Sequence, residues 1–137
     1  MRGLAAWAAS CAFLLVAFAA SAGATTYRVT ANPDITFTPK SIVIRQGDRI
    51  KFENAGGLHN VIADDGSFAC GFNCNTNTSP SDRPWSYTIP FNRVGTFGYY
   101  CEQHGNLTSG MRGQVIVLDN VFFDGFESVS VIPEPLP

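Results

Sequence analysis

The chain has 137 residues, of which 45% are hydrophobic and 15% are charged, and this length fits one small domain. Residues 25–118 carry eight Lys and Arg against seven Asp and Glu, whereas residues 119–137 carry four acids and no base. A nearly neutral body with an acidic tail has no extended basic surface. These charges exclude nucleic acid as an expected partner.

The first 24 residues have the pattern of a secretory signal peptide. A single charged residue, Arg2, precedes an apolar run from Leu4 to Ala20, and Ala22-Gly23-Ala24 follows as an A-x-A cleavage pattern. We expect cleavage after Ala24 and export to the periplasm or the extracellular space. An uncleaved membrane anchor is the alternative, because about 20 apolar residues can span a bilayer. No basic stop-transfer cluster follows, which favours cleavage and a mature chain without stable membrane insertion.

Residues 25–118 show the alternation of strands and no helical apolar period. Apolar and polar side chains alternate over short stretches, and Gly and Pro separate most of them. Seven strands are expected, at residues 27–30, 41–45, 49–53, 59–63, 85–89, 96–101 and 113–118. This pattern predicts an all-β fold, an antiparallel Greek-key β-sandwich. Residues 119–137 follow as an acidic, partly apolar tail to which the sequence assigns no role.

Cys70 and Cys74 lie inside a long polar stretch, residues 64–84. A loop of this length in a small domain is usually functional or tied down. Paired cysteines in an exported protein are expected as a disulfide, and closing so short a ring stabilises the fold by about 2 kcal/mol. Metal binding by this pair is the alternative, but C-x3-C with no histidine nearby is weak support for it.

Three side chains with sulfur or imidazole donors fall in the stretch YYCEQHGNLTSGMRG, namely Cys101, His104 and Met111. The other histidine, His59, opens a predicted strand. A buried cysteine is most often a small apolar residue, and a lone histidine there is usually structural. One thiolate, two imidazoles and a weak thioether nevertheless form the ligand set of a blue-copper electron-transfer centre.

The same residues resemble the cupredoxins, the small blue-copper proteins, near the plastocyanin, pseudoazurin and halocyanin-like branch. The resemblance covers most of residues 27–118 and rests on HNV at 59–61, GYYCEQH at 98–104 and GMRG at 110–113. It implies one copper ion, cycling between Cu(I) and Cu(II), with equatorial ligands His59, Cys101 and His104. It also implies an axial Met111, and a supporting Asn60 whose hydrogen bonds pin the cysteine loop.

The spacing of the ligand loop departs from this family. Plastocyanin-like loops run C-x2-H-x4-M, whereas this chain has C-x2-H-x6-M, two residues longer. Met111 must therefore reach the site across a longer loop. The backbone carbonyl of Leu58 is the alternative axial donor.

The resemblance implies a one-electron carrier, expected to be a monomer, that serves a redox protein such as a c-type cytochrome or a copper or haem oxidoreductase. Electrons would pass through the exposed edge of His104. The expected docking residues around it are Leu58, Gly105 and Leu107, with Tyr100 as a second docking point. A secreted copper-binding carrier without electron shuttling is the alternative function.

Other classes of site fit the sequence less well. A nucleophilic Cys101 with His104 as its base lacks an orienting acid, and a copper enzyme would need a second, histidine-rich site. Structural zinc sites favour a closed set of stronger donors than a thioether. We therefore expect no enzymatic activity.

Overall fold

The computed structural model describes residues 23–120, so most of the expected signal peptide and of the tail lies outside the described residues. These residues form nine strands and no helix, and thus no helix that could cross a membrane. The strands are β1 (Thr26–Asn32), β2 (Thr36–Thr38), β3 (Ser41–Arg45), β4 (Arg49–Asn54), β5 (Val61–Ala63), β6 (Ala69–Cys70), β7 (Ser86–Pro90), β8 (Gly95–Gly105) and β9 (Gly110–Leu118).

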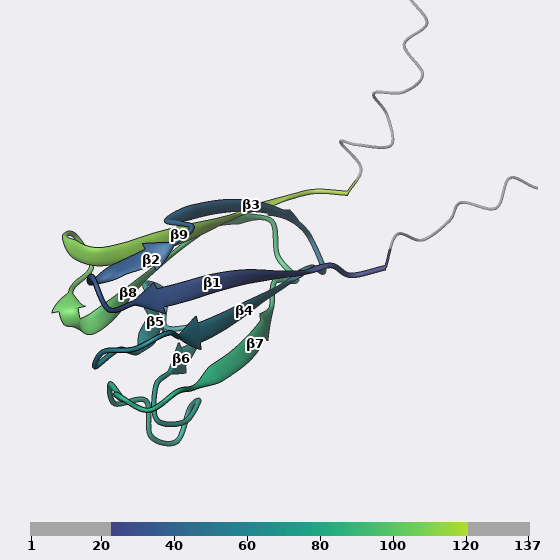
Figure 1. Ribbon diagram of the computed structural model, residues 1–137. Coiled ribbons are helices and arrows are strands. Elements are labelled where there is room, and N and C mark those ends of the chain that lie inside the picture. The colour runs from purple at the N-terminus through teal and green to yellow at the C-terminus, as the bar shows by residue number, and fades with distance from the viewer. Residues whose placement is uncertain (1–22, 121–137) are drawn as a thin grey trace, which may run out of the picture.

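The strands form two facing sheets, which confirms the predicted all-β sandwich (Figure 1). One sheet has the order β2-β1-β4-β7 and the other the order β3-β9-β8-β5-β6. Both are mixed, because β1 pairs with β4 and β3 pairs with β9 in parallel, while the remaining pairs are antiparallel. The turn at residues 46–48 therefore carries the chain from one sheet to the other, since β3 and β4 do not pair.

Two short strands, β2 and β6, were not predicted, and the strand expected to begin at His59 begins two residues later. β5 starts at Val61, and His59 forms an isolated bridge with Ser81 outside the named strands. Because this bridge belongs to the loop before β7, the histidine is held from a part of the chain that is distant in sequence.

Alternating side chains from both sheets meet in one core. The four-stranded sheet contributes Val29 and Ile50, and the five-stranded sheet contributes Val115 and Val117, each at most 1% exposed. This alternation is what a sheet with one buried face requires.

An aromatic cluster surrounds Tyr99 at the middle of this core. Its ring meets Phe37 and Phe52 edge to face, with centroids 5.0 and 5.1 Å apart. Such pairs add about 1 kcal/mol beyond the area that they bury. Tyr99 is two residues from Cys101 on the same face of β8, so this packing fixes the strand that carries the thiol.

The long polar stretch after β5 contains the disulfide that the sequence favoured. A disulfide joins Cys70, at the end of β6, to Cys74. Val61 of β5 pairs with Cys70 in the ladder, so this tied loop starts directly beside the strand that follows His59.

Tyr99→Phe tests a polar group that the core leaves unpaired. The Tyr99 hydroxyl is buried and has no hydrogen-bond partner among the described residues, and burial raises the pKa of the phenol. Removing an unpaired buried hydroxyl relieves its desolvation cost. We expect the free energy of unfolding to rise by about 1 kcal/mol in urea denaturation.

Tyr87→Phe is the matched control, because the exposed Tyr87 hydroxyl donates to the carbonyl of Phe72 at 2.9 Å. Losing that bond should leave the stability unchanged or slightly lower. A clear loss of stability in Tyr99→Phe would show that its hydroxyl makes a bond that matters.

Candidate metal centre

His59 is held by its backbone at the end of the sandwich. Its N–H donates to the Ser81 carbonyl at 3.2 Å, and the Ser81 N–H donates back at 2.9 Å. The Trp85 indole Nε1 also donates to the His59 carbonyl, at 3.1 Å. Three hydrogen bonds to one residue fix the position of its Cα, so the imidazole has little freedom beyond its own side-chain torsions.

Asn54, at the end of β4, ties together the two segments that meet at His59. Its side-chain amide donates to the carbonyls of Gly57 and Ser81, both at 3.0 Å, and its Oδ1 accepts from the N–H of Gly56 at 3.1 Å. The residue is 8% exposed. A buried amide with all these bonds acts as a rigid joint for the loop that leads into His59.

The His59 ring packs directly against Gly57. A Cβ on Gly57 would lie 2.6 Å from Nε2, and the residue has a φ of +94°, so both space and backbone require glycine here. Burial of the imidazole and, next, the neighbouring His104 lower the pKa of His59, while the backbones of Asn32 and Gly56 act in the opposite sense. A lowered pKa keeps the ring neutral near pH 7, the form that binds metal.

Cys101 and His104 lie on β8 where its pairing with β9 changes register. Tyr100 pairs with Arg112, and the next pair is Gly105 with Gly110, so the residues between them bulge out of the ladder. Bulges of this kind re-aim side chains near functional sites. Cys101 points inward and is 0% exposed, and His104 is half-buried.

The structure brings His59, Cys101 and His104 together. The Cys101 Sγ lies 3.8 Å from Nδ1 of His59 and 3.7 Å from Nδ1 of His104. One ligand atom from each of the three residues falls within 4.8 Å of the other two. The two imidazole rings have centroids 4.9 Å apart. Cys101 is the one free cysteine of the described residues.

These distances fit donors around one metal ion. A first-row ion such as zinc, with bonds of about 2.3 Å to sulfur and about 2.0 Å to nitrogen, separates the two donors by about 3.5 to 3.7 Å. The distances alone do not select the element. A single thiolate with two imidazoles is the trigonal set that favours copper in electron-transfer sites.

Met111 is buried at the start of β9. It is 2% exposed and directly follows Gly110, which pairs with Gly105. A Cβ on Gly110 would lie 2.3 Å from the carbonyl oxygen of His104, and one on Gly105 would lie 2.8 Å from the N–H nitrogen of Met111. The two glycines let the strands close tightly next to the histidine, so Met111 enters the core at the level of His104.

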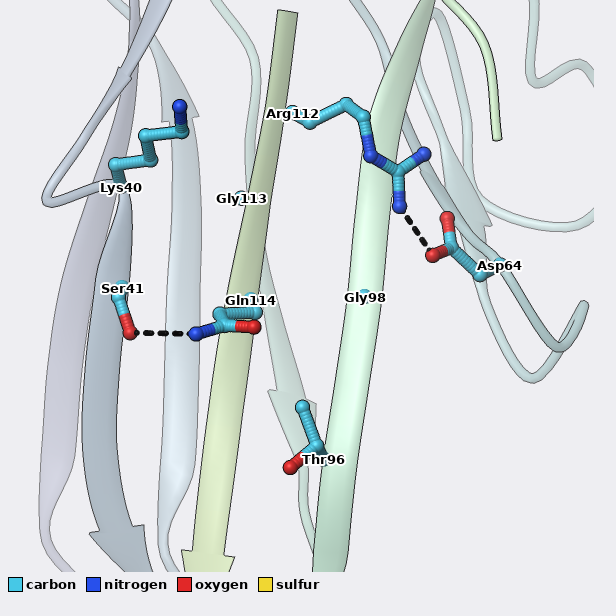
Figure 2. Close-up of a pocket in the computed structure, with 8 residues that line it drawn as sticks. All are labelled: Lys40, Ser41, Asp64, Thr96, Gly98, Arg112, Gly113 and Gln114. Atoms are coloured by element: carbon cyan, nitrogen blue, oxygen red, sulfur yellow. Dashed lines mark hydrogen bonds and ion pairs between the residues drawn. The ribbon is translucent and has the colours of Figure 1, made fainter. Parts of the chain in front are cut away.

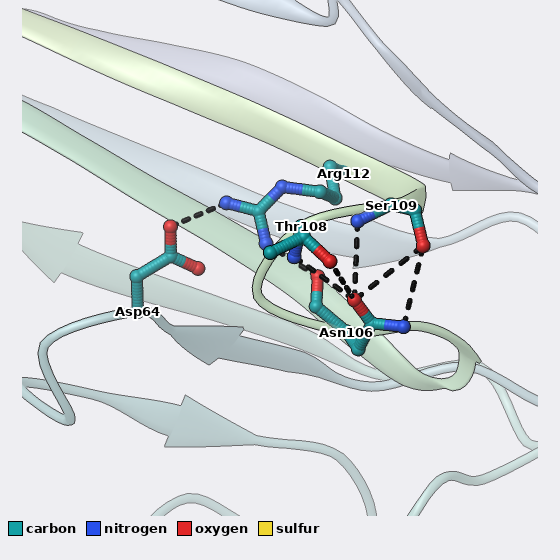
Figure 3. A network of polar contacts seen from close by, with 5 residues as sticks. All are labelled: Asp64, Asn106, Thr108, Ser109 and Arg112. Carbon is teal, nitrogen blue, oxygen red and sulfur yellow. Dashed lines mark hydrogen bonds and ion pairs between the residues drawn. The ribbon is translucent and has the colours of Figure 1, made fainter.

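The tip of the loop between these glycines is ordered by Asn106 (Figure 3). Its Oδ1 accepts from the N–H of Thr108 at 2.9 Å and from the N–H of Ser109 at 3.1 Å. Arg112 donates to the Asn106 carbonyl and also pairs with Asp64. The longer loop is therefore a compact hairpin anchored to the sheet.

Comparison with known proteins agrees with this geometry. Residues 24–118 match the family of copper-binding proteins that contains plastocyanin and azurin. The chain belongs to this family. It is 31% identical to the chloroplastic plastocyanin of Chlamydomonas reinhardtii over 79% of this chain and 76% of that protein. It is 34% identical to the chloroplastic plastocyanin of Physcomitrium patens over 84% of this chain and 68% of that protein.

Solved cupredoxins share the fold. Oxidised plastocyanin from Dryopteris crassirhizoma superposes with a TM-score of 0.51 at 22% identity. The match covers 67% of this chain and 100% of the plastocyanin chain. A Cu(I) form of a mutant amicyanin gives a TM-score of 0.51 at 21% identity, over 68% and 82% of the two chains. The expected cupredoxin family and its copper ion are thereby confirmed.

The other residues singled out in the sequence lie within three positions of His59, Cys101 or His104 along the chain. Asn60 is fully buried, and its Oδ1 accepts the N–H of Glu102 at 2.9 Å. Leu58 and Leu107 are 43% and 58% exposed. Tyr100 is half-buried on the outer face of β8, with the Arg112 guanidinium 5.9 Å from its ring centroid.

A trough on the five-stranded sheet is lined by residues from several strands (Figure 2), and none of His59, Cys101 and His104 is among its lining residues. Gly98 and Gly113 contribute no side chain there, the Arg112–Asp64 ion pair closes one side, and Gln114 donates to the Ser41 hydroxyl. Its lining contains no cysteine or histidine. The three clustered ligands therefore do not open into this trough.

Sequence reasoning missed the residues that hold His59. Asn54, Ser81 and Trp85 act through contacts between residues 22 to 27 positions apart, and no local pattern reveals such contacts. Gly57 also holds the histidine, because it is fitted against the imidazole ring.

Proposed function

We propose that His59, Cys101, His104 and Met111 bind one copper ion and that the protein is a one-electron carrier between redox partners. The observation that carries this proposal is the buried thiol placed 3.7–3.8 Å from two imidazole nitrogens. Bound copper supplies a reversible one-electron couple. Cys101 and the two histidines give soft and borderline donors that suit both oxidation states, and Met111 supplies a weak fourth donor.

The protein would supply a site whose geometry changes little between the two oxidation states of copper. His59 is fixed by three backbone hydrogen bonds, and Cys101 sits on a strand locked by the Tyr99 cluster. Donors held in this way cost little to reorganise when the charge of the ion changes. A fixed geometry with exclusion of water is the property that an electron carrier needs.

Loading the mature protein with copper tests this function. We expect intense visible absorption and a reversible one-electron wave in cyclic voltammetry. Cys101→Ser should abolish the absorption, because serine offers no thiolate. Copper binding with neither absorption nor reversible cycling would favour the alternative, a secreted copper carrier.

The substitution Met111→Leu tests whether Met111 is the axial ligand. Leucine keeps the apolar packing of this buried position and removes the thioether, so the colour should remain. The more highly charged Cu(II) loses more than Cu(I) when an electron-pair donor is removed, so the reduction potential should rise by about 60 mV or more, equivalent to a tenfold change in relative affinity for the two states. An unchanged potential would assign the axial position to another group, such as the Leu58 carbonyl.

We also propose that electrons pass at the half-buried edge of His104, and that a redox protein such as a c-type cytochrome or a copper or haem oxidoreductase docks there. Leu58 and Leu107 are exposed apolar side chains, and Gly105 adds no bulk beside them. Brief electron-transfer contacts use small surfaces of this kind. Tyr100 is the proposed second contact point.

Leu107→Asp tests this route through self-exchange between oxidised and reduced copies of the protein. Each encounter would then bring two carboxylates together in an apolar contact, and we expect the self-exchange rate measured by NMR line broadening to fall at least about tenfold. Val94→Asp is the control, since Val94 is 52% exposed in the loop between β7 and β8. Equal effects of both substitutions would argue against an electron route at His104.

The expected signal peptide and the candidate copper site together suggest where the protein acts. We propose a monomeric, exported carrier with no enzymatic activity, whose domain spans residues 25–118 after removal of residues 1–24. The tail, residues 119–137, remains without a proposed role. The mass of the protein recovered after export tests the cleavage, and a chain beginning at Met1 would contradict it.

A further inference from the structure

The loop closed by the Cys70–Cys74 disulfide folds back onto the strand that follows His59. Within it, Phe72 donates from its N–H to the Ser79 carbonyl at 3.0 Å, and Asn73 donates to the Asn77 carbonyl at 2.7 Å. With the disulfide, these bonds make residues 70–79, here called the disulfide loop, a compact unit.

Asn60 connects the disulfide loop to the cysteine loop. Its side-chain Nδ2 donates to the carbonyl of Thr78 at 2.9 Å. Its Oδ1 accepts the N–H of Glu102, the residue after Cys101, at 2.9 Å. One buried amide therefore joins both segments, and its orientation is set from the side of the disulfide loop.

The contact between the loop and Asn60 leaves no spare room. A Cβ on Gly71 would lie 2.2 Å from the Ser79 carbonyl oxygen, 2.6 Å from that of Thr78 and 2.9 Å from the Cβ of Asn60. Gly71 directly follows Cys70, so the disulfide fixes the chain at the point of closest approach. The Thr78 carbonyl is thereby aimed at the Asn60 amide.

We propose that the disulfide loop is a positioning element for the copper ligands, acting through Thr78 and Asn60 on the backbone beside Cys101. With the Thr78 carbonyl in place, the amide of Asn60 has one orientation, and its Oδ1 holds the Glu102 N–H. This inference rests on the proposed function only in taking His59 and Cys101 as ligands. The link itself is a property of the chain without metal.

Amide hydrogen exchange in the metal-free protein tests the link directly. In Cys70→Ser/Cys74→Ser the loop is no longer closed, and we expect the Glu102 amide to exchange at least about tenfold faster than in the unaltered protein, because its acceptor loses its fixed orientation. The Val115 amide in β9 serves as the internal reference for global stability. Thr76→Ala, in an exposed position of the same loop, is the matched control and should leave the Glu102 amide protected.

Two outcomes of this measurement would overturn the proposal. The first is unchanged protection of Glu102 in the double serine variant. The second is an equal loss at Glu102 and Val115, which would show a general destabilisation. Should the double variant fail to fold, Gly71→Ala probes the same link, since its Cβ must push Thr78 away from Asn60, and the same two outcomes apply.

A double-mutant cycle in the copper-loaded protein then tests the effect on the site. We expect opening of the disulfide to lower copper affinity about tenfold, the range found for residues that orient ligands, and to change the visible spectrum. In an Asn60→Ser background the same opening should have less than half of this effect. Additive effects would show that the loop does not act through Asn60. A colourless unaltered protein would refute the proposed function and leave the exchange result as the test of the link.

Discussion

The hydrogen bond from the Glu102 N–H to Asn60 Oδ1 is the interaction on which the metal centre depends. It joins two segments 42 residues apart, each carrying a proposed ligand at the adjacent position, His59 before Asn60 and Cys101 before Glu102. The bond therefore sets the distance between an imidazole and the thiolate. A buried amide with both ends occupied holds such a distance firmly, because any displacement leaves a polar group unpaired.

Packing and hydrogen bonds on both sides of this bond further restrict the positions of the two segments. The sheet behind Cys101 is locked by Tyr99 and its aromatic neighbours, and His59 is fixed by Ser81 and Trp85. The donor atoms consequently lie at metal-bound spacing in the protein alone. A site formed in advance spends little binding energy on ordering its ligands, and it would impose one geometry on both oxidation states of the proposed copper ion.

The sequence predicted the donor residues of this site better than the contacts that hold them in position. Residues 96–101 were expected as a strand, and alternation along a strand puts Tyr99 and Cys101 on the same face; both are fully buried. The donor types identified the metal class, since they follow from the residues alone. The contacts of Ser81, Trp85 and Thr78 were missed, because each joins segments that only the folded sandwich brings together. The parallel pairing of β3 with β9 was missed for the same reason, since alternation gives the face of a strand and not its neighbour.

The longer ligand loop shows why spacing in sequence is a poor measure of reach. Met111 is separated from His104 by six residues, yet the pairing of Gly105 with Gly110 returns the chain to the level of the histidine. The position of the methionine is fixed by how closely two strands approach at this pair. The number of residues beyond it matters only for the hairpin tip, which Asn106 and Arg112 organise on their own. Because both positions of this closing pair lack a Cβ, the strands meet here and the additional residues are taken up in the hairpin tip.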